Sequence, residues 1–535
     1  MNGPAGTLVG TAAMVRLVLR RDRVRLPVWL AGIVGLVVVS AASVAGLYST
    51  PAEIAQYVAL SDGNPTLVAV NGPGIGFDAP NVGVVLVNEA SLWGAVACAF
   101  MSVFLVVRHT RTEEDEERTD LLRSGVLGRH ASLAAAVLVV GTANLVVSAL
   151  LFALVVPLGF PATGTAAFAA GIGLVGLVFT GLAAISAQVF GSARGALGAG
   201  VATIGLSYGI RAAGDVAESP LSWLSPLGWA HRVRAYAGES WWVLALCVVV
   251  AAVAIAVARV LADHRDLGSG LLPQRLGRAD AVGSLSGPVG LAVPLQRGQV
   301  VAWSVGLFVL GSVYGAVGRD VEKMFEDNPE LEDFIAQIGG ASITDSYLSY
   351  TLLLGAMMAS GFAIASVLRL RGEEVAGRTD IVLAGPTGRW RWVRSQYLVT
   401  TVGTAVLLVA SGLGTGVGLA VAVGDAAEVP RLVAASLVHL PAVLVLAGLT
   451  AACQGAVPRW AQAAWAGLAV VVIVGLFGEL LRLPSWVRWI SPMEHTPGLP
   501  AEHLRLLPVA VLIAVALGAF ALGAGAFERR DVAVA

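Results

Sequence analysis

The sequence predicts an all-α integral membrane protein with about twelve transmembrane helices, arranged as two parallel six-helix repeats. The first observation is composition, since 57% of the 535 residues are hydrophobic and only 13% are charged, whereas soluble domains average about 25% charged residues. The mean hydropathy is +0.80. The other two observations are a series of long apolar segments and a charged motif that occurs twice. A chain with so little polar surface needs lipid as its main solvent.

Twelve apolar segments are candidates for transmembrane helices, each of which needs about 20 mostly apolar residues. The two shortest and most glycine-rich candidates, 196–211 and 461–478, have the weakest signal. In chain order, the candidates are 27–47, 84–107, 131–157, 166–190, 196–211 and 241–262 in the first half, and 300–317, 347–368, 397–423, 432–453, 461–478 and 506–527 in the second half.

The basic residues indicate the orientation, because Lys and Arg concentrate in cytoplasmic loops. With the N-terminus inside and the loops assigned by alternation, 25 of the 34 basic residues are cytoplasmic. The loss of one span would invert every later loop and place the Arg-rich segment 369–394 outside. We therefore expect a multi-pass protein of the cell membrane with both termini in the cytoplasm.

The chain also contains an internal repeat. Residues 111–129 and 371–389 align without gaps and are identical at nine of nineteen positions. Each copy follows the second candidate span of its half. Because both copies have the same orientation, the halves are expected to be related by an axis along the membrane normal.

This repeat sets the predicted domain boundaries. Residues 1–262 form the first six-helix half, residues 263–290 form a polar cytoplasmic linker, and residues 291–535 form the second half. The segment from Leu8 to Arg25 alternates an apolar stripe with arginines, a pattern typical of a helix at the membrane interface. The alternative for this segment is an ordinary positively charged flank.

Within the repeated motif, charged residues have helical spacing. We interpret each copy as a short cytoplasmic helix that joins two spans and that a partner protein pushes. The alternative is a solvated loop whose charges keep it inside, but solubility does not require the same residues at fixed places in both halves. The candidate coupling residues are Glu113, Glu114, Arg118, Thr119, Asp120, Glu373, Glu374, Arg378, Thr379 and Asp380.

Polar residues near the outer ends of two spans are candidates for a substrate path, since ionisable groups in spans are often functional. Asn88 and Glu89 lie near the outer end of the second candidate span, and Asp345 lies near the outer end of the eighth. The alternative is that each residue only marks the end of a helix.

Several functions are excluded by missing motifs. A phosphate-binding Walker loop ends in Gly-Lys-Ser/Thr, but the single lysine, Lys323, lies in Val-Glu-Lys-Met-Phe. The chain therefore contains no ATPase site of this type. The histidines and cysteines have no metal-ligand spacing, no catalytic motif is found, and nothing suggests nucleic-acid binding.

Two features of the chain resemble the ABC-2 type exporter permeases. They are the two copies of Glu-Glu…Arg-Thr-Asp…Gly-Arg, at 113–129 and 373–389, and the Trp-Leu-Ser-Pro-Leu-Gly-Trp run at 223–229. The resemblance is to the fused twelve-span membrane subunits of actinobacterial antibiotic exporters of the tetronasin and polyketide type. It covers nearly the whole chain. The second half departs from it at 489–495, where Ser-Pro is followed by Met-Glu-His.

This resemblance implies a transporter subunit rather than an enzyme. Two copies of a separate P-loop ABC ATPase, which bind ATP and Mg, would dock beneath the two halves. The repeated helices would act as coupling helices, and a lipophilic small molecule such as an antibiotic or drug would move outward through the bilayer.

Two other classes remain as alternatives. A secondary multidrug transporter of the major-facilitator type also repeats a Gly/Asp/Arg motif, but the long outside segments 48–83 and 318–346 and the absence of a charge at mid-membrane argue against it. The third class is a membrane scaffold or sensor that transports nothing.

Overall fold

A computed structural model describes most of the chain. The described residues are 6–116, 127–266, 268–272, 283–285, 287–326, 343–477 and 483–530. They form helices and no sheet, apart from one isolated bridge between Phe190 and Leu272. The chain divides into two compact units, Met1–Gly277 and Arg278–Ala535, and this division lies within the predicted linker. Each unit is described by itself.

Unit 1 contains a bundle of long helices with short helices at its ends. Its elements are η1 (Gly6–Leu8), α1 (Thr11–Arg21), α2 (Arg25–Leu47), α3 (Pro51–Ser61), α4 (Pro65–Asn71), α5 (Val82–Leu86), the π-helix η2 (Val87–Ser91), α6 (Leu92–Val107), the π-helix η3 (Arg108–Thr112), α7 (Glu113–Asp115), α9 (Ala131–Val155), η4 (Val156–Leu158), α10 (Ala162–Val189), α11 (Ala193–Val216), η5 (Pro220–Leu224), α12 (Pro226–Arg232) and α13 (Trp241–Asp263).

Unit 2 is built in a similar way. Its elements are η6 (Gly283–Leu285), α14 (Pro288–Glu326), α16 (Ile343–Val375), α17 (Arg378–Leu383), α18 (Arg389–Val423), α19 (Glu428–Leu437), α20 (Leu440–Ala456), η7 (Pro458–Ala463), α21 (Ala464–Phe477), α22 (Ser485–Arg488), η8 (Pro492–His495) and α23 (Leu506–Arg529).

Eleven stretches of the described chain are long and apolar enough to cross a membrane. They are Arg25–Leu47, Val82–Asp115, Ala131–Leu158, Ala162–Val189, Trp241–Asp263, Pro288–Gly318, Ile343–Val375, Arg389–Val423, Glu428–Ala456, Pro458–Leu476 and Leu506–Arg529. Each overlaps one candidate from the sequence. Large apolar side chains such as Val39, Val249 and Leu517 are exposed on the outer faces of these helices, as lipid contact requires. The chain is a multi-pass membrane protein.

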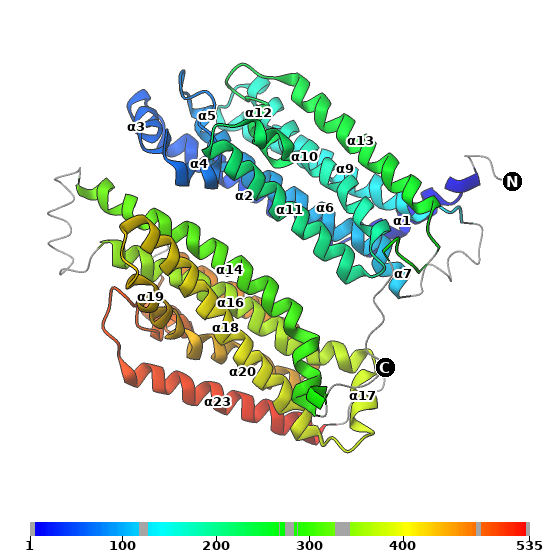
Figure 1. Cartoon of the computed structure of the whole chain (residues 1–535), viewed down its shortest axis with the longest axis vertical. Helices are drawn as coiled ribbons and strands as arrows, with labels where there is room; N and C mark the ends of the chain where they lie inside the picture. Colours follow the sequence, from blue (N-terminus) through cyan, green and yellow to red (C-terminus); the bar gives the residue numbers. More distant parts are fainter. Residues whose placement is uncertain are drawn as a thin grey trace. The chain divides into compact units, whose positions relative to one another are not determined.

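The candidate 196–211 is the one of the twelve that none of these eleven stretches overlaps. It lies in α11, a helix of 24 residues, which is about 36 Å long at 1.5 Å per residue. Glycines and the pair Arg211 and Asp215 lower its hydropathy. The helix nevertheless packs along α10 and α6 within the bundle (Figure 1).

The core of unit 1 forms around α10, which packs against α6, α9, α11 and α13. Small residues allow this close packing, and a polar cluster joins three helices at its centre. Asn144 Nδ2 donates to Ser102 Oγ at 2.9 Å, and Ser102 Oγ donates to the carbonyl of Gly176 at 2.9 Å. Such interhelical hydrogen bonds are the polar contacts expected inside a membrane bundle.

In unit 2, α14 and α18 pack closely through small residues. A Cβ added to Gly414 would lie 2.1 Å from the carbonyl oxygen of Phe308, and one added to Gly418 would lie 2.1 Å from the carbonyl oxygen of Ser312. These two glycines are four residues apart and form the close-approach face typical of membrane helices.

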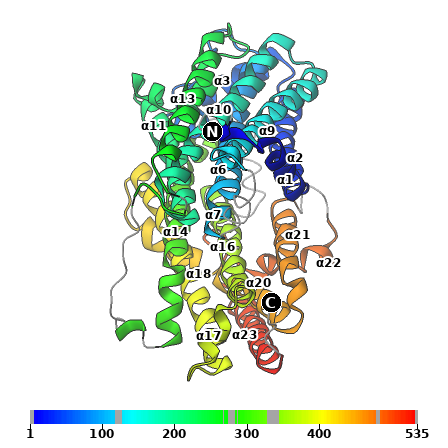
Figure 2. The same cartoon turned by 90° about the vertical axis from the view of Figure 1, so that its right-hand side faces the viewer.

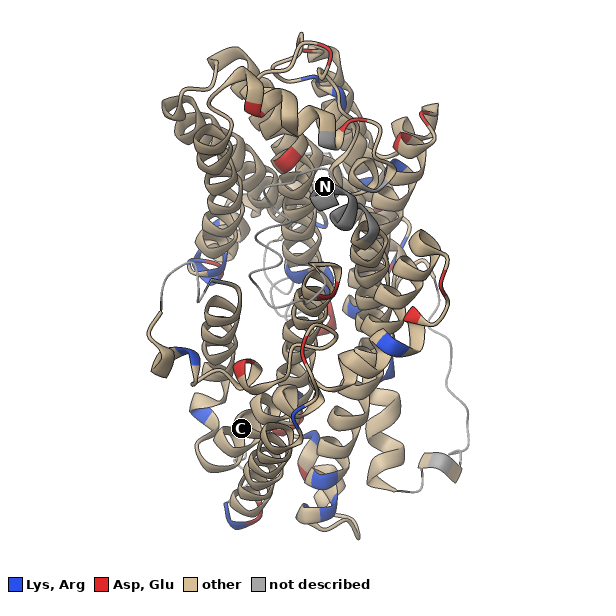
Figure 3. Cartoon of the chain, turned by 90° about the vertical axis from the view of Figure 1, so that its left-hand side faces the viewer, with Lys and Arg blue, Asp and Glu red and all other residues tan. Residues whose placement is uncertain are grey.

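Charged residues lie mostly at the ends of the helices in each unit (Figure 3). In unit 1, α7 lies at the same end as α1, while α3, α4 and α12 lie at the opposite end (Figure 1). In unit 2, α17 lies at the end that carries the C-terminus and α19 lies at the other end. The two copies of the repeated motif are therefore each at one end of their own bundle.

Helix α1 lies beside α2 and α9 (Figure 2). It buries Met14 and Val18 and exposes Leu19, and Leu8 in the preceding turn is also exposed. Two leucines of the predicted apolar stripe are thus exposed, and the interfacial position of this segment stays a prediction.

Candidate functional site

The first copy of the repeated motif lies where the second span of unit 1 ends. The π-helix η3 continues α6 directly into α7, and π-helical segments often occur at functional sites. Glu113 in α7 accepts a hydrogen bond from Arg21 Nη1 at 2.5 Å. This ion pair raises the pKa of Arg21 and fastens α1 to the end of the second span.

Glu114 is largely buried, and arginines of its own chain surround its carboxylate. Its carboxylate binds Arg265 at 2.6 and 2.7 Å and Arg111 at 2.8 Å. Arg111 is fully buried and also donates to the carbonyls of Gly268 and Ser269 at 2.9 and 2.8 Å. The Glu114–Arg265 ion pair therefore joins the end of the second span to the segment that follows the last span, α13.

Gln188 extends this contact to a third span. Arg265 Nε donates to Gln188 Oε1 at 2.7 Å, at the end of α10. The backbone amides of Leu271 and Leu272 donate to the carbonyls of Gln188 and Val189 at 3.3 and 2.9 Å. The first part of the predicted linker thus belongs to the packed structure of unit 1.

Unit 2 contains the corresponding ion pair. Glu374 accepts two hydrogen bonds from Arg530 Nη2, both at 2.7 Å, and only 4% of its side chain is exposed. Glu374 aligns with Glu114, and Arg530 follows the last span of unit 2 as Arg265 follows that of unit 1. The neighbouring Glu373 binds Arg378 at 2.6 Å.

The last arginine of the motif makes equivalent contacts in both units. Arg129 donates to the carbonyls of Ala262, Asp263 and Arg265, each at 3.0 Å. Arg389, which aligns with Arg129, donates to the carbonyls of Glu528 and Arg530 at 3.2 and 2.9 Å. In each unit the repeated motif therefore binds the C-terminal end of the last span at two points.

The ten candidate coupling residues fall into three groups. Arg118, Thr119 and Asp120 lie outside the described residues. The glutamates Glu113, Glu114, Glu373 and Glu374 bind arginines of their own unit. In α17, Thr379 is buried, whereas Arg378 and Asp380 are exposed. Ile381, which the sequence did not single out, is 76% exposed on the same helix.

The candidate substrate-path residues are held by segments at the opposite ends of the bundles. The Tyr57 hydroxyl lies 2.8 Å from Asn88 Oδ1 and 2.9 Å from Glu89 Oε1, and burial together with the Glu89 charge raises the pKa of Tyr57. In unit 2, Asp345 binds Arg431 through two contacts of 2.7 Å. These contacts fasten α3 and α19 to neighbouring spans, and a role in a substrate path stays a prediction.

A further charged cluster, which the sequence did not reveal, is buried in unit 1. Arg211 on α11 is fully buried, donates to the carbonyls of Val68 and Ala69 and lies 3.4 Å from Asp215. The spacing of Arg211 and Asp215, four residues apart on one helix, was the available signal. The carbonyl partners come from a segment some 140 residues earlier and could not be read from spacing.

Comparison with known proteins agrees with this architecture. Residues 285–528 match the family model described as the C-terminal domain of multidrug efflux system permease Rv1217c. The chain is 35% identical over 531 residues to the multidrug efflux system permease protein Rv1217c of Mycobacterium tuberculosis, covering 98% of this chain and 95% of that protein. The chain therefore belongs to the family of this multidrug efflux system permease.

Proposed function

We propose that the chain is the membrane-spanning permease of an ABC-2 type multidrug exporter, which moves a lipophilic compound outward with energy from a separate P-loop ATPase. The family supports efflux, because the similar mycobacterial protein is named a permease of a multidrug efflux system. The sequence supports a separate ATPase, since no Walker loop accompanies its single lysine.

The observation that carries the proposal is the duplicated contact between the repeated motif and the last span. In each unit a glutamate at the end of the second span, with at most 9% of its side chain exposed, binds an arginine after the last span. A displacement applied at the motif therefore moves two spans of that unit together. This is the mechanical property that a coupling element needs, because the ATPase must rearrange helices and not only a loop.

The proposal also includes twelve spans, with α11 as the fifth. This helix has the length of a span and lies along α10 and α6. With α11 across the bilayer, both copies of the motif and both termini lie in the cytoplasm, where an ATPase can bind. Labelling of single cysteines placed near residues 115 and 375 in intact cells tests this topology, and labelling from the outside would contradict it.

The surface of α17 provides the direct test of coupling. Charge reversal of Glu113 or Glu114 would destabilise unit 1, because both carboxylates are bound internally. Asp380→Arg and Ile381→Asp instead alter exposed positions. We expect both variants to fold, to recover less of a roughly 30 kDa ATPase, the size of a domain of about 250–300 residues, and to lose substrate-stimulated ATP hydrolysis.

Arg505→Glu serves as the control, since Arg505 is exposed at the N-terminus of α23, away from α17. Unchanged ATPase recovery in both α17 variants would refute the coupling role of this helix. Export by the purified chain alone, driven by a proton gradient in liposomes, would instead identify a secondary transporter.

A further inference from the structure

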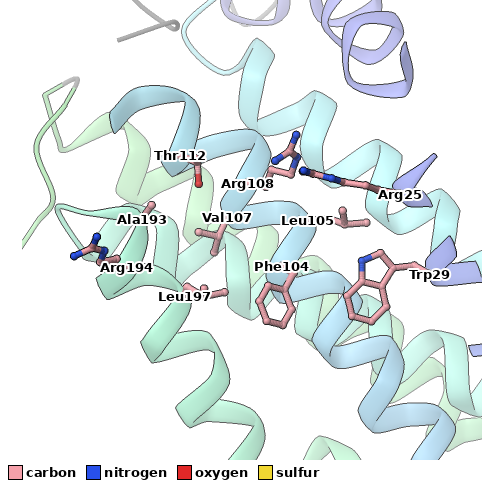
Figure 4. A pocket seen from close by; sticks show the side chains of 10 residues that line it. All are labelled: Arg25, Trp29, Phe104, Leu105, Val107, Arg108, Thr112, Ala193, Arg194 and Leu197. Carbon is pink, nitrogen blue, oxygen red and sulfur yellow. The ribbon is translucent and has the colours of Figure 1, made fainter. Parts of the chain in front are cut away.

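A pocket of about 350 Å³ opens in unit 1 between α2, α6 and the start of α11 (Figure 4). It lies at the end of the bundle that carries the repeated motif, because Arg108 and Thr112 of η3 line it. The three arginines that line it are Arg25, Arg108 and Arg194. Arg25 and Arg108 lie on one side of the pocket and Arg194 lies on the opposite side (Figure 4).

The pocket carries a net positive charge. None of its ten lining residues is Asp or Glu. Arg108 binds Asp22 at 3.3 Å, but this buried carboxylate is also 2.5 Å from His109. Arg25 and Arg194 are exposed and have no carboxylate partner within the described part of the chain. At least two guanidinium groups are therefore available to an anion.

Apart from Thr112, the rest of the wall is apolar, and the pocket opens at the surface of unit 1. The rings of Trp29 and Phe104 stack with centroids 6.1 Å apart, and Leu105 and Leu197 extend the same wall. Phe104 is 40% exposed on the outer face of α6. A ligand that fills this pocket must present an anionic head to the arginines and an apolar chain to the aromatic rings.

Two of the three arginines, Arg25 and Arg108, are absent from the corresponding positions of unit 2. Arg23 and Trp29 match Arg297 and Trp303 at the same spacing, so Arg25 corresponds to Gln299. When the offset of 260 between the two motif copies is extended to the residues before them, Arg108 corresponds to Leu368. The duplicated fold therefore does not require these arginines. Their presence in unit 1 alone favours a ligand over a purely architectural role.

We propose that this pocket binds an anionic phospholipid, with its phosphate between the arginines and its acyl chain against Trp29 and Phe104. Basic pockets between transmembrane helices at the cytoplasmic surface are known binding sites for anionic headgroups. Placement in the inner leaflet rests on the topology proposed above, whereas the lipid selectivity of the pocket does not. Binding in detergent, where both ends of the bundle are accessible, therefore tests the pocket independently of the topology.

The experiment is native mass spectrometry of the full chain titrated with dioleoyl phosphatidylglycerol or dioleoyl phosphatidylcholine. We expect one phosphatidylglycerol to bind at least tenfold more tightly than phosphatidylcholine. The variant Arg25→Gln/Arg194→Gln should weaken this binding about 30-fold, because each basic residue near an anionic headgroup contributes about fivefold. Both side chains are exposed, so the variant is expected to fold.

The matched control is Arg259→Gln, which removes an exposed arginine from α13 outside the pocket and should leave binding unchanged. Equal binding of the two lipids, or selectivity that survives the double substitution, would overturn the proposal. Displacement of phosphatidylglycerol by excess glycerol 3-phosphate would also overturn it, since the pocket would then select a free phosphate and not a lipid.

Discussion

Removal of the Glu114 carboxylate should destabilise unit 1. In Glu114→Gln, the guanidinium groups of Arg265 and Arg111 both lose a carboxylate at hydrogen-bonding distance. The side chain of Arg111 is 0% exposed and that of Arg265 is 8% exposed. Loss of one partner of a buried ion pair costs about 3–5 kcal/mol.

The lower end of this range applies here. Arg111 keeps Asp115 at 3.5 Å and two backbone carbonyls, so we expect a loss of about 3 kcal/mol in the free energy of unfolding. Arg265→Gln should cost about 2 kcal/mol, because Glu114 keeps its hydrogen bond from Arg111. The double variant should cost at least 1 kcal/mol less than the sum, the sign of a direct interaction.

Equilibrium unfolding in mixed detergent micelles measures these differences for the unsubstituted protein, the two single variants and the double variant. Glu374→Gln is the matched substitution in unit 2 and should cost about 2 kcal/mol, since Arg530 is more exposed than Arg265, at 17%. If the costs of Glu114→Gln and Arg265→Gln add up to the cost of the double variant within about 0.5 kcal/mol, the two side chains do not interact. This result would refute the proposed joint movement of the two spans.

Two further outcomes follow from the packing of unit 1. Gly176→Ala should lower the free energy of unfolding by about 1–3 kcal/mol through overpacking, because the added Cβ would lie 2.0 Å from Asn144 Oδ1. The control Gly205→Ala should cost nothing, since no atom lies within 4 Å of the added Cβ. Equal unfolding free energies for the two variants would contradict this prediction. Burial, followed by the nearby positive charges, lowers the pKa of His231 to about 3 from about 6.5 in the unfolded chain. At a pH between these two pKa values, His231 is protonated in the unfolded chain but not in the folded chain. The free energy of unfolding therefore falls as the pH drops, by about 2 kcal/mol between pH 7 and pH 5. In His231→Asn the difference in unfolding free energy between pH 7 and pH 5 should be smaller by that amount, and an unchanged difference would show that His231 is solvated.

The spans were largely predictable because lipid imposes a simple requirement, about 20 consecutive apolar residues. The weakest signal belongs to α11, whose candidate segment 196–211 ends at the buried Arg211. Its charge is neutralised by Asp215 and by the carbonyls of Val68 and Ala69, which hydropathy cannot detect. Sequence patterns report the cost of a charge in lipid and not the tertiary contacts that remove this cost.

The candidate site was only half predictable, for a related reason. The internal repeat identified Glu114 and Glu374 through their own alignment. Their partners Arg265 and Arg530 lie 151 and 156 residues further along the chain, and Arg265 falls in the segment interpreted as a linker. Spacing reveals contacts within one helix, whereas contacts between distant segments become visible only in the folded structure.

The two copies of the motif share a glutamate–arginine ion pair but differ in the burial of their first arginine. In unit 1, Arg111 is fully buried beneath Glu114 and bound to the carbonyls of Gly268 and Ser269. The matching Arg371 in unit 2 is only half-buried, and α17 beyond it exposes Ile381. The coupling role proposed for both copies therefore rests on the shared ion pair and not on the burial of this arginine.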